Sequence, residues 1–220
     1  MRKEIKFEFP LGYNISLERY LLINSCKEIY KPRKVNSFYY DDYNFSLFNQ
    51  NIDGIGFRNK YRCRFYNDGK DGFIVENKLK RNQFNEKKFL APKKINKTSL
   101  ITNQKDLTFK VSETEIISLP PVIMENYYPK VFVSYKRKYF MSYYRKARIT
   151  IDTKINFSKV LVKKNNIFLL AKRFLNHNIL EIKFENDSQE ISNFISKIAN
   201  EFNLTYSNCS KYTKAIELIY

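Results

Sequence analysis

Long apolar runs and paired cysteines are absent from this sequence, and each absence argues against a class of protein. No apolar run approaches the ~18 residues of a membrane-spanning helix, and residues 1–6 lack the apolar core of a secretory signal. We therefore expect a soluble, cytoplasmic protein with no membrane span in this chain. The cysteines Cys26, Cys63 and Cys209 are odd in number and lack zinc-type spacing, so they support neither a disulfide framework nor a zinc site and predict buried free thiols.

Histidine and flexible linkers are scarce as well. The one histidine, His177, lies between Asn176 and Asn178, a context that predicts an exposed turn residue. No Cys/His or Ser/His pairing is legible, so the sequence gives no sign of a nucleophile activated by histidine. No stretch rich in Pro, Gly or Ser divides the 220 residues, and we expect a single domain over 1–220.

Positive charge is abundant. The chain has 40 Lys and Arg against 22 Asp and Glu, a formal net charge of +18. Such an excess predicts a polyanionic partner, which could be nucleic acid, an acidic membrane or a chain of phosphates. The charge alone does not choose among these.

The stretch Phe57–Tyr66 concentrates that charge. In a strand, alternate side chains point to opposite faces, which here separates four cations from a mostly apolar and aromatic face. The charged face carries Arg58, Lys60, Arg62, Arg64 and Tyr66, and the other carries Phe57, Asn59, Tyr61, Cys63 and Phe65. Cations at ~6–7 Å intervals repel one another and call for a compensating anion.

The same alternation of charged and apolar positions recurs along the chain. The expected strands are Arg2–Phe9, Arg33–Asp42, Phe73–Lys80, Val131–Tyr144, Arg148–Asp152 and Ile179–Glu185, and Asn44–Asn49 could form another. A hairpin turn is predicted at Asn67–Gly72 and a second turn at Asp53-Gly54. Expected helices are Leu17–Cys26 capped by Ser16, a helix after Asp187-Ser188 that reaches Phe202, and Ser210–Leu218. Between them, a Lys-rich loop is expected at Lys93–Lys97 and one or two helices between Asp106 and Leu119.

Two folds fit these half-charged strands. In the first, an antiparallel barrel turns its charged faces inward, and helices cover its apolar faces. In the second, an open sheet exposes its charged faces to water, which is the usual place for a run of charges. Periodicity alone favours the open sheet. Two observations favour the barrel: cations outnumber anions on the central strand, and carboxylates occur singly among the cations.

Eight short motifs, in order and at similar spacing, resemble the VTC domain, the polyphosphate polymerase module of the vacuolar transporter chaperone complex, within the triphosphate tunnel metalloenzyme (CYTH-like) superfamily. The motifs are Arg2-x-Glu4-x-Lys6, Ser37-x-Tyr39-Tyr40-Asp41, Lys60-x-Arg62-x-Arg64-x-Tyr66, Glu76-x-Lys78, Tyr135-x-Arg137, Arg148-x-Thr150-x-Asp152, Leu180-Glu181-Ile182-Lys183 and Ser210-Lys211-Tyr212. The resemblance implies a mainly β (α+β) fold, an eight-stranded antiparallel tunnel barrel with a charged interior and flanking helices. It also implies transfer of the terminal phosphoryl group of ATP onto polyphosphate, with Mn²⁺ or Mg²⁺.

Carried onto this chain, the resemblance implies roles for named residues. Catalytic phosphate contacts are expected from Arg62, Arg64, Lys78, Arg137 and Arg148, further phosphate binding from Lys6, Lys60, Lys183 and Lys211, and metal binding from Glu181, with Glu4 and Glu76 as alternates. In the other interpretation, these carboxylates form ion pairs that reduce the repulsion between neighbouring cations. It applies to Glu4, Glu76, Glu185 and Asp152. Tyr39, Tyr66 and Tyr139 are expected to pack or hydrogen-bond structurally.

The residue types suit this chemistry independently. Phosphoryl transfer depends mostly on positioning and on stabilising charge on phosphate oxygens, for which Arg and Lys are the expected groups. A phosphate acceptor already carries an anionic oxygen, so a strong general base is not needed. The expected partners are ATP, inorganic triphosphate and polyphosphate, without a specific nucleic acid. Two alternatives stay open: a triphosphatase using the same residues, and a non-catalytic module that binds polyphosphate or RNA. The 17 Tyr and 19 Phe favour the binding module, because aromatic side chains among cations suit single strands.

Overall fold

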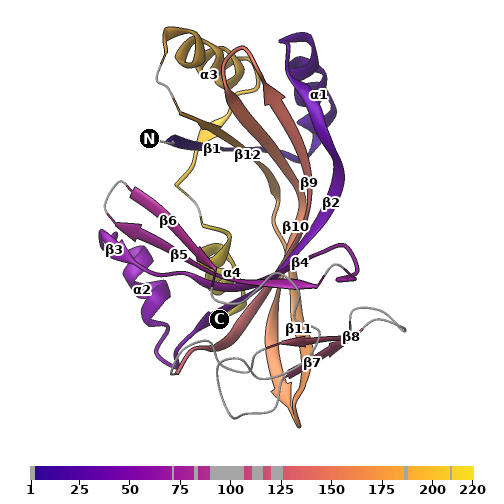
Figure 1. The fold of residues 1–220 in the computed structure, drawn as a ribbon, viewed down its shortest axis with the longest axis vertical. Coiled ribbons are helices and arrows are strands. Elements are labelled where there is room, and N and C mark those ends of the chain that lie inside the picture. Colours follow the sequence, from indigo (N-terminus) through magenta and orange to yellow (C-terminus); the bar gives the residue numbers. More distant parts are fainter. Residues whose placement is uncertain are drawn as a thin grey trace. The chain divides into compact units, whose positions relative to one another are not determined.

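The computed structural model in Figure 1 is mainly β with helices at several points of the chain. It describes residues 3–70, 72–81, 84–89, 107–110, 116–119, 126–185, 188–208 and 210–220. The strands are β1 (Lys3–Pro10), β2 (Lys27–Asp41), β3 (Phe57–Arg58), β4 (Tyr61–Tyr66), β5 (Phe73–Arg81), β6 (Phe84–Phe89), β7 (Leu107–Lys110), β8 (Ile116–Leu119), β9 (Tyr128–Ser142), β10 (Ala147–Lys163), β11 (Asn166–Phe174), β12 (His177–Phe184) and β13 (Thr205–Tyr206). The helices are the short η1 (Leu11–Tyr13), α1 (Asn14–Ile23), α2 (Ser46–Ile52), α3 (Gln189–Glu201) and α4 (Lys211–Ile219).

The chain packs as two compact units. Unit 1 comprises Met1–Lys34, Tyr135–Ile155 and Phe174–Cys209, and unit 2 comprises Val35–Ser134, Asn156–Arg173 and Ser210–Tyr220. Neighbouring strands follow the order β13-β1-β12-β10-β9-β2 in unit 1 and β10-β9-β2-β4-β5-β3 in unit 2, so that β2, β9 and β10 contribute to both. β7 pairs with β11 in parallel, whereas pairs such as β1–β12 and β4–β5 are antiparallel. Within the described ranges, neither order closes into a ring.

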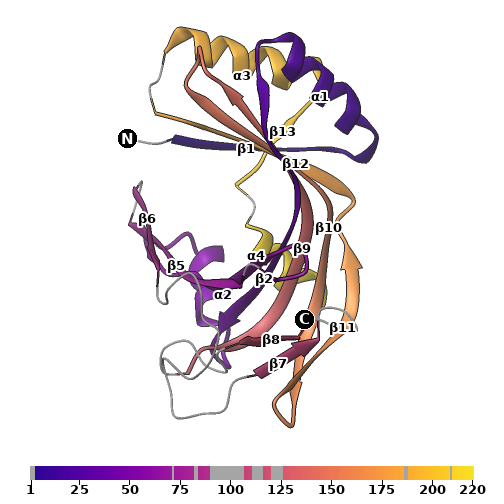
Figure 2. The same cartoon turned by 45° about the vertical axis from the view of Figure 1, so that its right-hand side comes forward.

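The core of unit 1 lies between one face of its strands and two helices. Apolar side chains of β1, β10 and β12, such as Phe7, Ile149 and Leu180, pack with Leu17 of α1 and Ile191 of α3. Figure 2 shows α1 and α3 over the same side of β1 and β12. The opposite faces of these strands carry the charged residues, as the alternation predicts.

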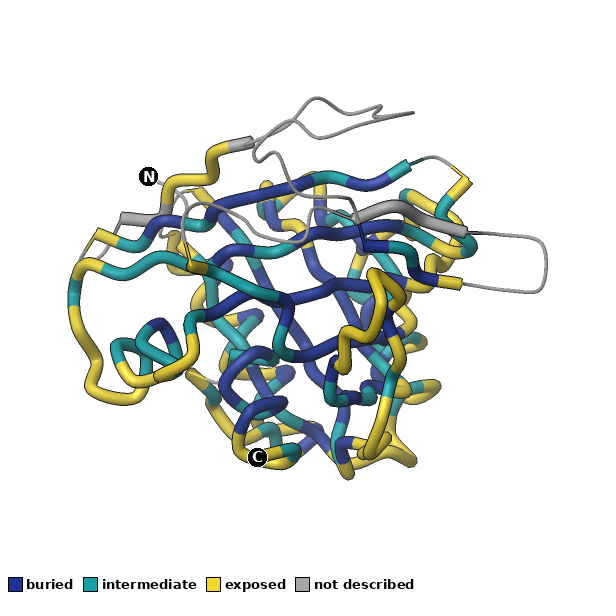
Figure 3. Tube along the Cα trace, turned by 90° about the horizontal axis from the view of Figure 1, so that it is seen from below, coloured by how far each residue is buried: buried dark blue, intermediate teal, exposed yellow. Residues whose placement is uncertain are grey.

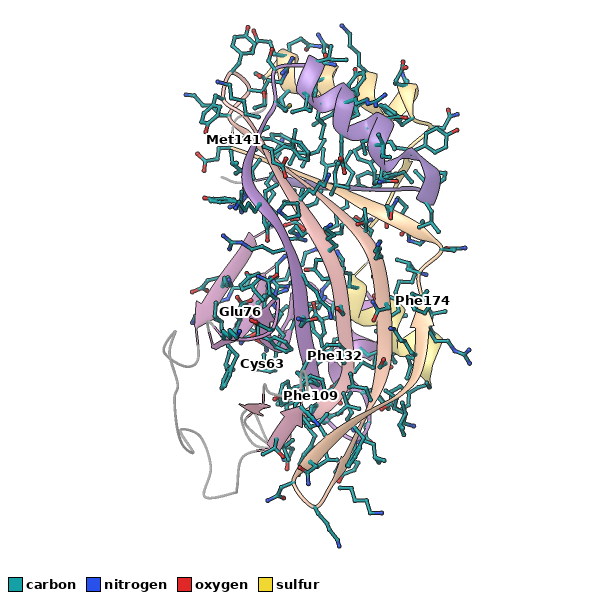
Figure 4. The ribbon with its side chains drawn as sticks, turned by 90° about the vertical axis from the view of Figure 1, so that its right-hand side faces the viewer. Cys63, Glu76, Phe109, Phe132, Met141 and Phe174 are labelled. Atoms are coloured by element: carbon teal, nitrogen blue, oxygen red, sulfur yellow. The ribbon has the colours of Figure 1, made fainter. Side chains whose placement is uncertain are left out.

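The core of unit 2 is aromatic. The ring centroids of Phe38 and Phe132 lie 4.8 Å apart, and Phe109 lies 5.1 Å from Phe38 and 5.7 Å from Phe132. Figure 4 shows Phe109 and Phe132 as close neighbours. Cys63 of β4 belongs to the same cluster, so β4 buries its apolar face here and turns Arg62 and Arg64 to the other side.

Buried residues lie along much of the strands, and exposed residues gather at turns and ends, along most of β11 and in the first half of β2 (Figure 3). Cys26 and Cys63 are buried free thiols, as predicted, while Cys209 lies outside the described residues. Among the described residues, no helix has the length and apolar character needed to cross a bilayer.

Many predicted elements are confirmed, with shifted ends. The strands expected at Arg2–Phe9, Phe73–Lys80 and Ile179–Glu185 are β1, β5 and β12. Ser188 caps α3 as expected, because its side-chain oxygen accepts the N–H of Ile191 at 3.4 Å. The predicted strands at Arg33–Asp42, Val131–Tyr144 and Arg148–Asp152 belong to the longer β2, β9 and β10, and α4 is the helix predicted from Ser210.

The strand considered for Asn44–Asn49 is wrong. Residues from Ser46 form α2, because the carboxylates of Asp41 and Asp42 accept backbone N–H groups at the start of this helix. Asp42 accepts the N–H of Ser46 at 2.9 Å, and Asp41 accepts those of Leu47 and Phe48. Two consecutive acidic residues therefore satisfy the N–H groups that a helix start leaves free.

The central strand and the first helix also differ from prediction. Phe57–Tyr66 is interrupted at Asn59 and Lys60, and Phe57 pairs with Arg81 in β3 and is 56% exposed instead of facing the core. The helix predicted at Leu17–Cys26 begins at Asn14 without a side-chain cap from Ser16 and ends at Ile23.

Three further predictions need correction or fall outside the description. His177 is not an exposed turn residue, since it begins β12 and its Nε2 lies 3.2 Å from a Glu8 carboxylate oxygen. The helices expected between Asp106 and Leu119 are wrong where the structure describes that segment, because Leu107–Lys110 and Ile116–Leu119 pair as strands. The predicted loop at Lys93–Lys97 lies outside the described residues.

Candidate functional site

In unit 2, charged side chains share one face of β4 and β5. Arg62 and Arg64 alternate with the buried apolar residues of β4, and Arg62 is paired in register with Glu76 of β5. Lys78 lies two residues after Glu76 and therefore on the same face. We call this set the unit 2 cationic cluster: Lys60, Arg62, Arg64, Lys78, Lys87 and Lys211 around Glu76.

Glu76 is the carboxylate at the centre of this cluster. It is 1% exposed, and its oxygens contact Arg62 Nη2 at 2.6 Å and Lys87 Nζ at 2.5 Å. Burial by itself raises the pKa of this carboxyl group, but Arg62, Arg64 and Lys87 more than offset it and hold the pKa below the ordinary value of a glutamate. Glu76 is thus an ionised counter-charge, and the ion-pairing interpretation of this residue fits better than metal binding.

Arg64 and Tyr39 lie next to this pair. Arg64 is 8% exposed, and its Nε donates to Ser37 Oγ at 3.2 Å. Tyr39 is the register partner of Arg62 on β2, and its hydroxyl accepts a hydrogen bond from the Arg62 side chain. Burial would raise the pKa of Tyr39, yet Arg62, Arg64 and Lys211 lower it below the ordinary tyrosine value, which shows how strongly positive this face is.

The start of α4 adds the remaining members. Lys60 Nζ donates to Ser210 Oγ at 2.6 Å, and Lys211 follows Ser210 as the first residue of the helix. Lys211 is close enough to Tyr39 to lower the pKa of its hydroxyl. The predicted phosphate-binding residues Lys60, Lys78 and Lys211 are therefore gathered with Arg62 and Arg64 in unit 2.

Unit 1 holds a second charged group, on the faces of β1 and β12 opposite its core. Lys6 contacts Glu4 at 2.8 Å, and Lys183 contacts Glu4 at 3.0 Å and Glu181 at 2.7 Å. Lys6 and Glu181 are register partners, as are Arg148 and Lys183. We call this set the unit 1 mixed cluster: Glu4, Lys6, Arg137, Arg148, Asp152, Glu181 and Lys183.

Arg137 and Asp152 form the most buried pair of that cluster. Arg137 Nε and Nη2 donate to the two oxygens of Asp152 at 2.6 and 2.7 Å, and Asp152 is fully buried. Burial alone would lower the pKa of Arg137, but Asp152, followed by Tyr135 and Glu181, raises it well above its ordinary value. This two-point pairing makes Arg137 a fixed cation and Asp152 its structural counter-ion.

Glu181 and Thr150 form the oxygen-bearing position that best fits a hard divalent cation. They are register partners on β12 and β10, which brings their side chains close, and they are 7% and 5% exposed. The Thr150 Oγ1 atom is buried without a hydrogen-bond partner. Because no three His, Cys, Asp or Glu side chains gather around one point in the described part of the chain, a cation there would complete its shell with phosphate and water oxygens.

Every predicted site residue is described, and they fall into these two clusters. The structure also adds residues to which the sequence assigned no site role: Lys87, and the motif residues Asp41, Thr150 and Tyr212. Lys87 lies in β6, where no strand was predicted. Asp41 could have been found from its place two residues after Tyr39, on the same face of the strand.

A comparison with protein families matches residues 11–220 to the VTC domain. Among solved structures, a candidate adenylate cyclase from Vibrio parahaemolyticus is similar at a TM-score of 0.51 with 11% identity, covering 97% of this chain and 97% of that one. A candidate adenylyl cyclase from Hippeastrum, described as having a dominant triphosphatase activity, also reaches 0.51 with 10% identity, covering 100% of this chain and 97% of that one. At these identities the similarity establishes the fold, which is CYTH-like. A comparison with curated proteins found no match.

Proposed function

Because the chain belongs to the VTC domain family, we propose that it is a metal-dependent polyphosphate polymerase that transfers the terminal phosphoryl group of ATP onto a growing chain of inorganic phosphate. The triphosphate tunnel family to which the VTC domain belongs is enzymatic and typically depends on a divalent metal. The closed eight-stranded barrel expected from the resemblance is part of this proposal.

The observation that carries the proposal is the composition of the unit 2 cationic cluster. Among the described residues, this cluster brings together six cations, two of which, Arg62 and Lys87, contact Glu76. A face that gathers this many cations attracts a ligand with several negative charges, and a triphosphate group supplies them. Arg62 and Arg64 would bind phosphate oxygens through their planar forks, and the lysines would act as point charges.

The residues also suit the transfer step. The charge of the transferring phosphoryl group is spread over its oxygens, and cations already fixed in place stabilise that charge without reorganising. Arg64 is buried and Arg62 is fixed by Glu76, so neither needs to move far to do this. The acceptor is a terminal phosphate that carries its own anionic oxygen, which agrees with a cluster whose central carboxylate is an ion-pair partner and not a base.

A divalent ion would be held in unit 1 by Glu181 and the Thr150 hydroxyl, which offer the oxygen ligands that Mg²⁺ and Mn²⁺ prefer. When bound, it would neutralise phosphate charge. Lys6, Lys183 and Arg148 of the same cluster would add phosphate contacts. Glu181 is preferred to Glu4 as a ligand because the buried Thr150 hydroxyl lies at its register position.

A triphosphatase is the second candidate, because the similar structure from Hippeastrum is described as having that activity. In that case water replaces the phosphate acceptor, with the same residues holding the triphosphate. Both candidates predict consumption of ATP or triphosphate, and they differ in the product.

The deciding experiment incubates the purified protein with ATP and Mn²⁺ and separates long phosphate chains from free phosphate by gel electrophoresis. Long chains support the polymerase, and free phosphate alone supports the triphosphatase. In parallel, Arg62→Ala is expected to abolish both turnover and tripolyphosphate binding, and Glu181→Ala is expected to abolish turnover with binding retained. If neither variant changes any phosphate chemistry, the chain is a binding module for polyanions.

A further inference from the structure

Two residues at the start of α4 and the end of β2 are joined in a way that phosphate binding alone does not explain. The Tyr212 hydroxyl donates to Asp41 Oδ2, and both residues are buried, at 1% and 0% exposure. The Tyr212 ring also stacks on Tyr39, with 5.4 Å between centroids and 26° between planes. All three residues belong to unit 2 and to two of the sequence motifs, yet no phosphate-binding role has been given to them.

Asp41 is fixed by four donors. Its Oδ1 accepts the backbone N–H of Asp42 at 2.8 Å and of Leu47 at 3.1 Å, and its Oδ2 accepts the N–H of Phe48 at 3.0 Å together with the Tyr212 hydroxyl. Three of these donors belong to the backbone at the end of β2 and the start of α2. The carboxylate therefore has little freedom to move, and it transmits that rigidity to Tyr212.

The hydroxyl of Tyr212 is a permanent donor. Burial, together with the neighbouring Asp41, raises the pKa of Tyr212 far above its ordinary value, so the proton stays on the tyrosine at neutral pH. The link is therefore a single directed hydrogen bond from α4 to β2. It adds to the contact between α2 and α4.

Lys211 lies between two anchors. On one side Ser210 Oγ accepts from Lys60 at 2.6 Å, and on the other Tyr212 is held by Asp41 and Tyr39. A lysine has a long, flexible side chain, and a binding site loses affinity when it must order such a group. Anchors on both neighbours fix the Lys211 backbone and so reduce the ordering that binding requires.

We propose that Asp41 and Tyr212 are positioning residues for phosphate binding, whose buried hydrogen bond holds the start of α4 so that Lys211 lies at the unit 2 cationic cluster. This inference rests on the proposed function, and it extends that function to two residues that do not themselves contact substrate.

The test is a double-mutant cycle read by tripolyphosphate binding in calorimetry. Lys211→Ala and Tyr212→Phe are each expected to weaken binding by about 10-fold, because the first removes the cation and the second removes the hydrogen bond that places it. If Tyr212 acts through Lys211, the double variant binds no more weakly than Lys211→Ala alone. Additive losses, to about 100-fold in the double variant, would mean that Tyr212 acts independently of Lys211 and would overturn the proposal.

Tyr40→Phe is the matched control. Tyr40 is the neighbouring buried tyrosine, belongs to the aromatic core of unit 2, and lies on the other face of β2. It is expected to leave tripolyphosphate binding unchanged, and a loss equal to that of Tyr212→Phe would overturn the proposal. Should Tyr212→Phe fail to fold, Asp41→Asn takes its place in the same cycle, with the same expected coupling to Lys211→Ala.

The readout separates this inference from the proposed function. If the wild-type protein binds tripolyphosphate but makes no polyphosphate, the polymerase proposal fails while the cycle still tests the positioning. If the protein makes polyphosphate and the two losses are additive, the positioning alone fails. Absence of tripolyphosphate binding in the wild-type protein overturns both.

Discussion

The unit 2 cationic cluster and the unit 1 mixed cluster contain similar residue types but differ in their balance of charge. Among the described residues, the unit 2 cluster places six cations with Glu76, which contacts Arg62 and Lys87, whereas the unit 1 cluster places the four cations Lys6, Arg137, Arg148 and Lys183 with three carboxylates, Glu4, Asp152 and Glu181. A cluster with a large excess of positive charge attracts an external anion more strongly than one with nearly equal numbers of cations and carboxylates. Under the proposed function, we therefore expect most of the triphosphate affinity to come from unit 2, and the divalent cation to be held in unit 1.

The largest expected effect concerns the compensated pair of unit 1. Asp152→Ala should lower the free energy of unfolding by ~3–5 kcal/mol, because it leaves the Arg137 guanidinium without the partner that offsets its burial. Urea denaturation measures this. Lys214→Ala, which breaks an exposed pair with Glu217, is the control and should cost less than ~1 kcal/mol. If the two variants lose equal free energy of unfolding, the Arg137–Asp152 pair stabilises the fold no more than an exposed ion pair does.

The second prediction tests the metal assignment in unit 1. Glu181→Gln keeps the size of the side chain but removes its charge, and the Mn²⁺ concentration for half-maximal turnover should rise by about 100-fold. The matched control is Glu185→Gln, which makes the same change one residue beyond the end of β12 at an exposed position. If both variants respond to Mn²⁺ alike, Glu181 is not the ligand.

The third prediction compares the two clusters directly. Arg64→Ala in unit 2 should weaken tripolyphosphate binding by about 10- to 30-fold, the usual loss for a charge-assisted contact. Arg148→Ala in unit 1 should weaken it by only about threefold, because carboxylates balance that cluster. Arg173→Ala, at an exposed position of β11, controls for the change in net charge and should have no effect. A larger loss for Arg148 than for Arg64 would reverse the assignment of affinity to unit 2.

The smallest effect is the pH dependence of the Glu76 ion pairs. The pKa of Glu76 is lower in the folded protein than in the unfolded chain, so its stabilisation is complete above the unfolded pKa and is lost as pH falls through the folded one. The difference in Tm between wild type and Glu76→Gln should therefore shrink as pH falls below ~4.3. If the difference in Tm does not change with pH, the cationic neighbours do not lower the pKa of Glu76.

Local chemistry accounts for the elements that the sequence predicted well. Period-two alternation identified β1, β4, β5 and β12, because each buries one face and leaves the other charged. It failed at Ser46–Ile52, where the two preceding aspartates start a helix, a capping contact that period-two counting does not register. It also failed at Leu107–Lys110, where pairing with another strand decides the conformation of a short segment.

In the candidate site, too, local patterns identified some features and missed others. Arg62, Arg64, Lys78 and Glu181 could be named from motifs, since a motif fixes which residues share a strand face. The contact of Lys87 with Glu76, the pairing of Thr150 with Glu181 and the link between Asp41 and Tyr212 could not be predicted, because the two partners lie 11, 31 and 171 positions apart in the sequence. Such pairs are set by strand register and by where α4 packs, and neither is visible in a local pattern.

The sequence by itself determined the charge of this protein and its distribution: a strongly basic chain whose strands carry rows of Arg, Lys and Glu on one face. That information is local, because alternation along a strand places side chains on faces without reference to the rest of the chain. Only the tertiary structure decided which cations share a carboxylate, which oxygens stand together at Glu181 and Thr150, and how α4 is anchored. Those facts depend on contacts between distant segments, and it is the packing of the whole chain that selects them.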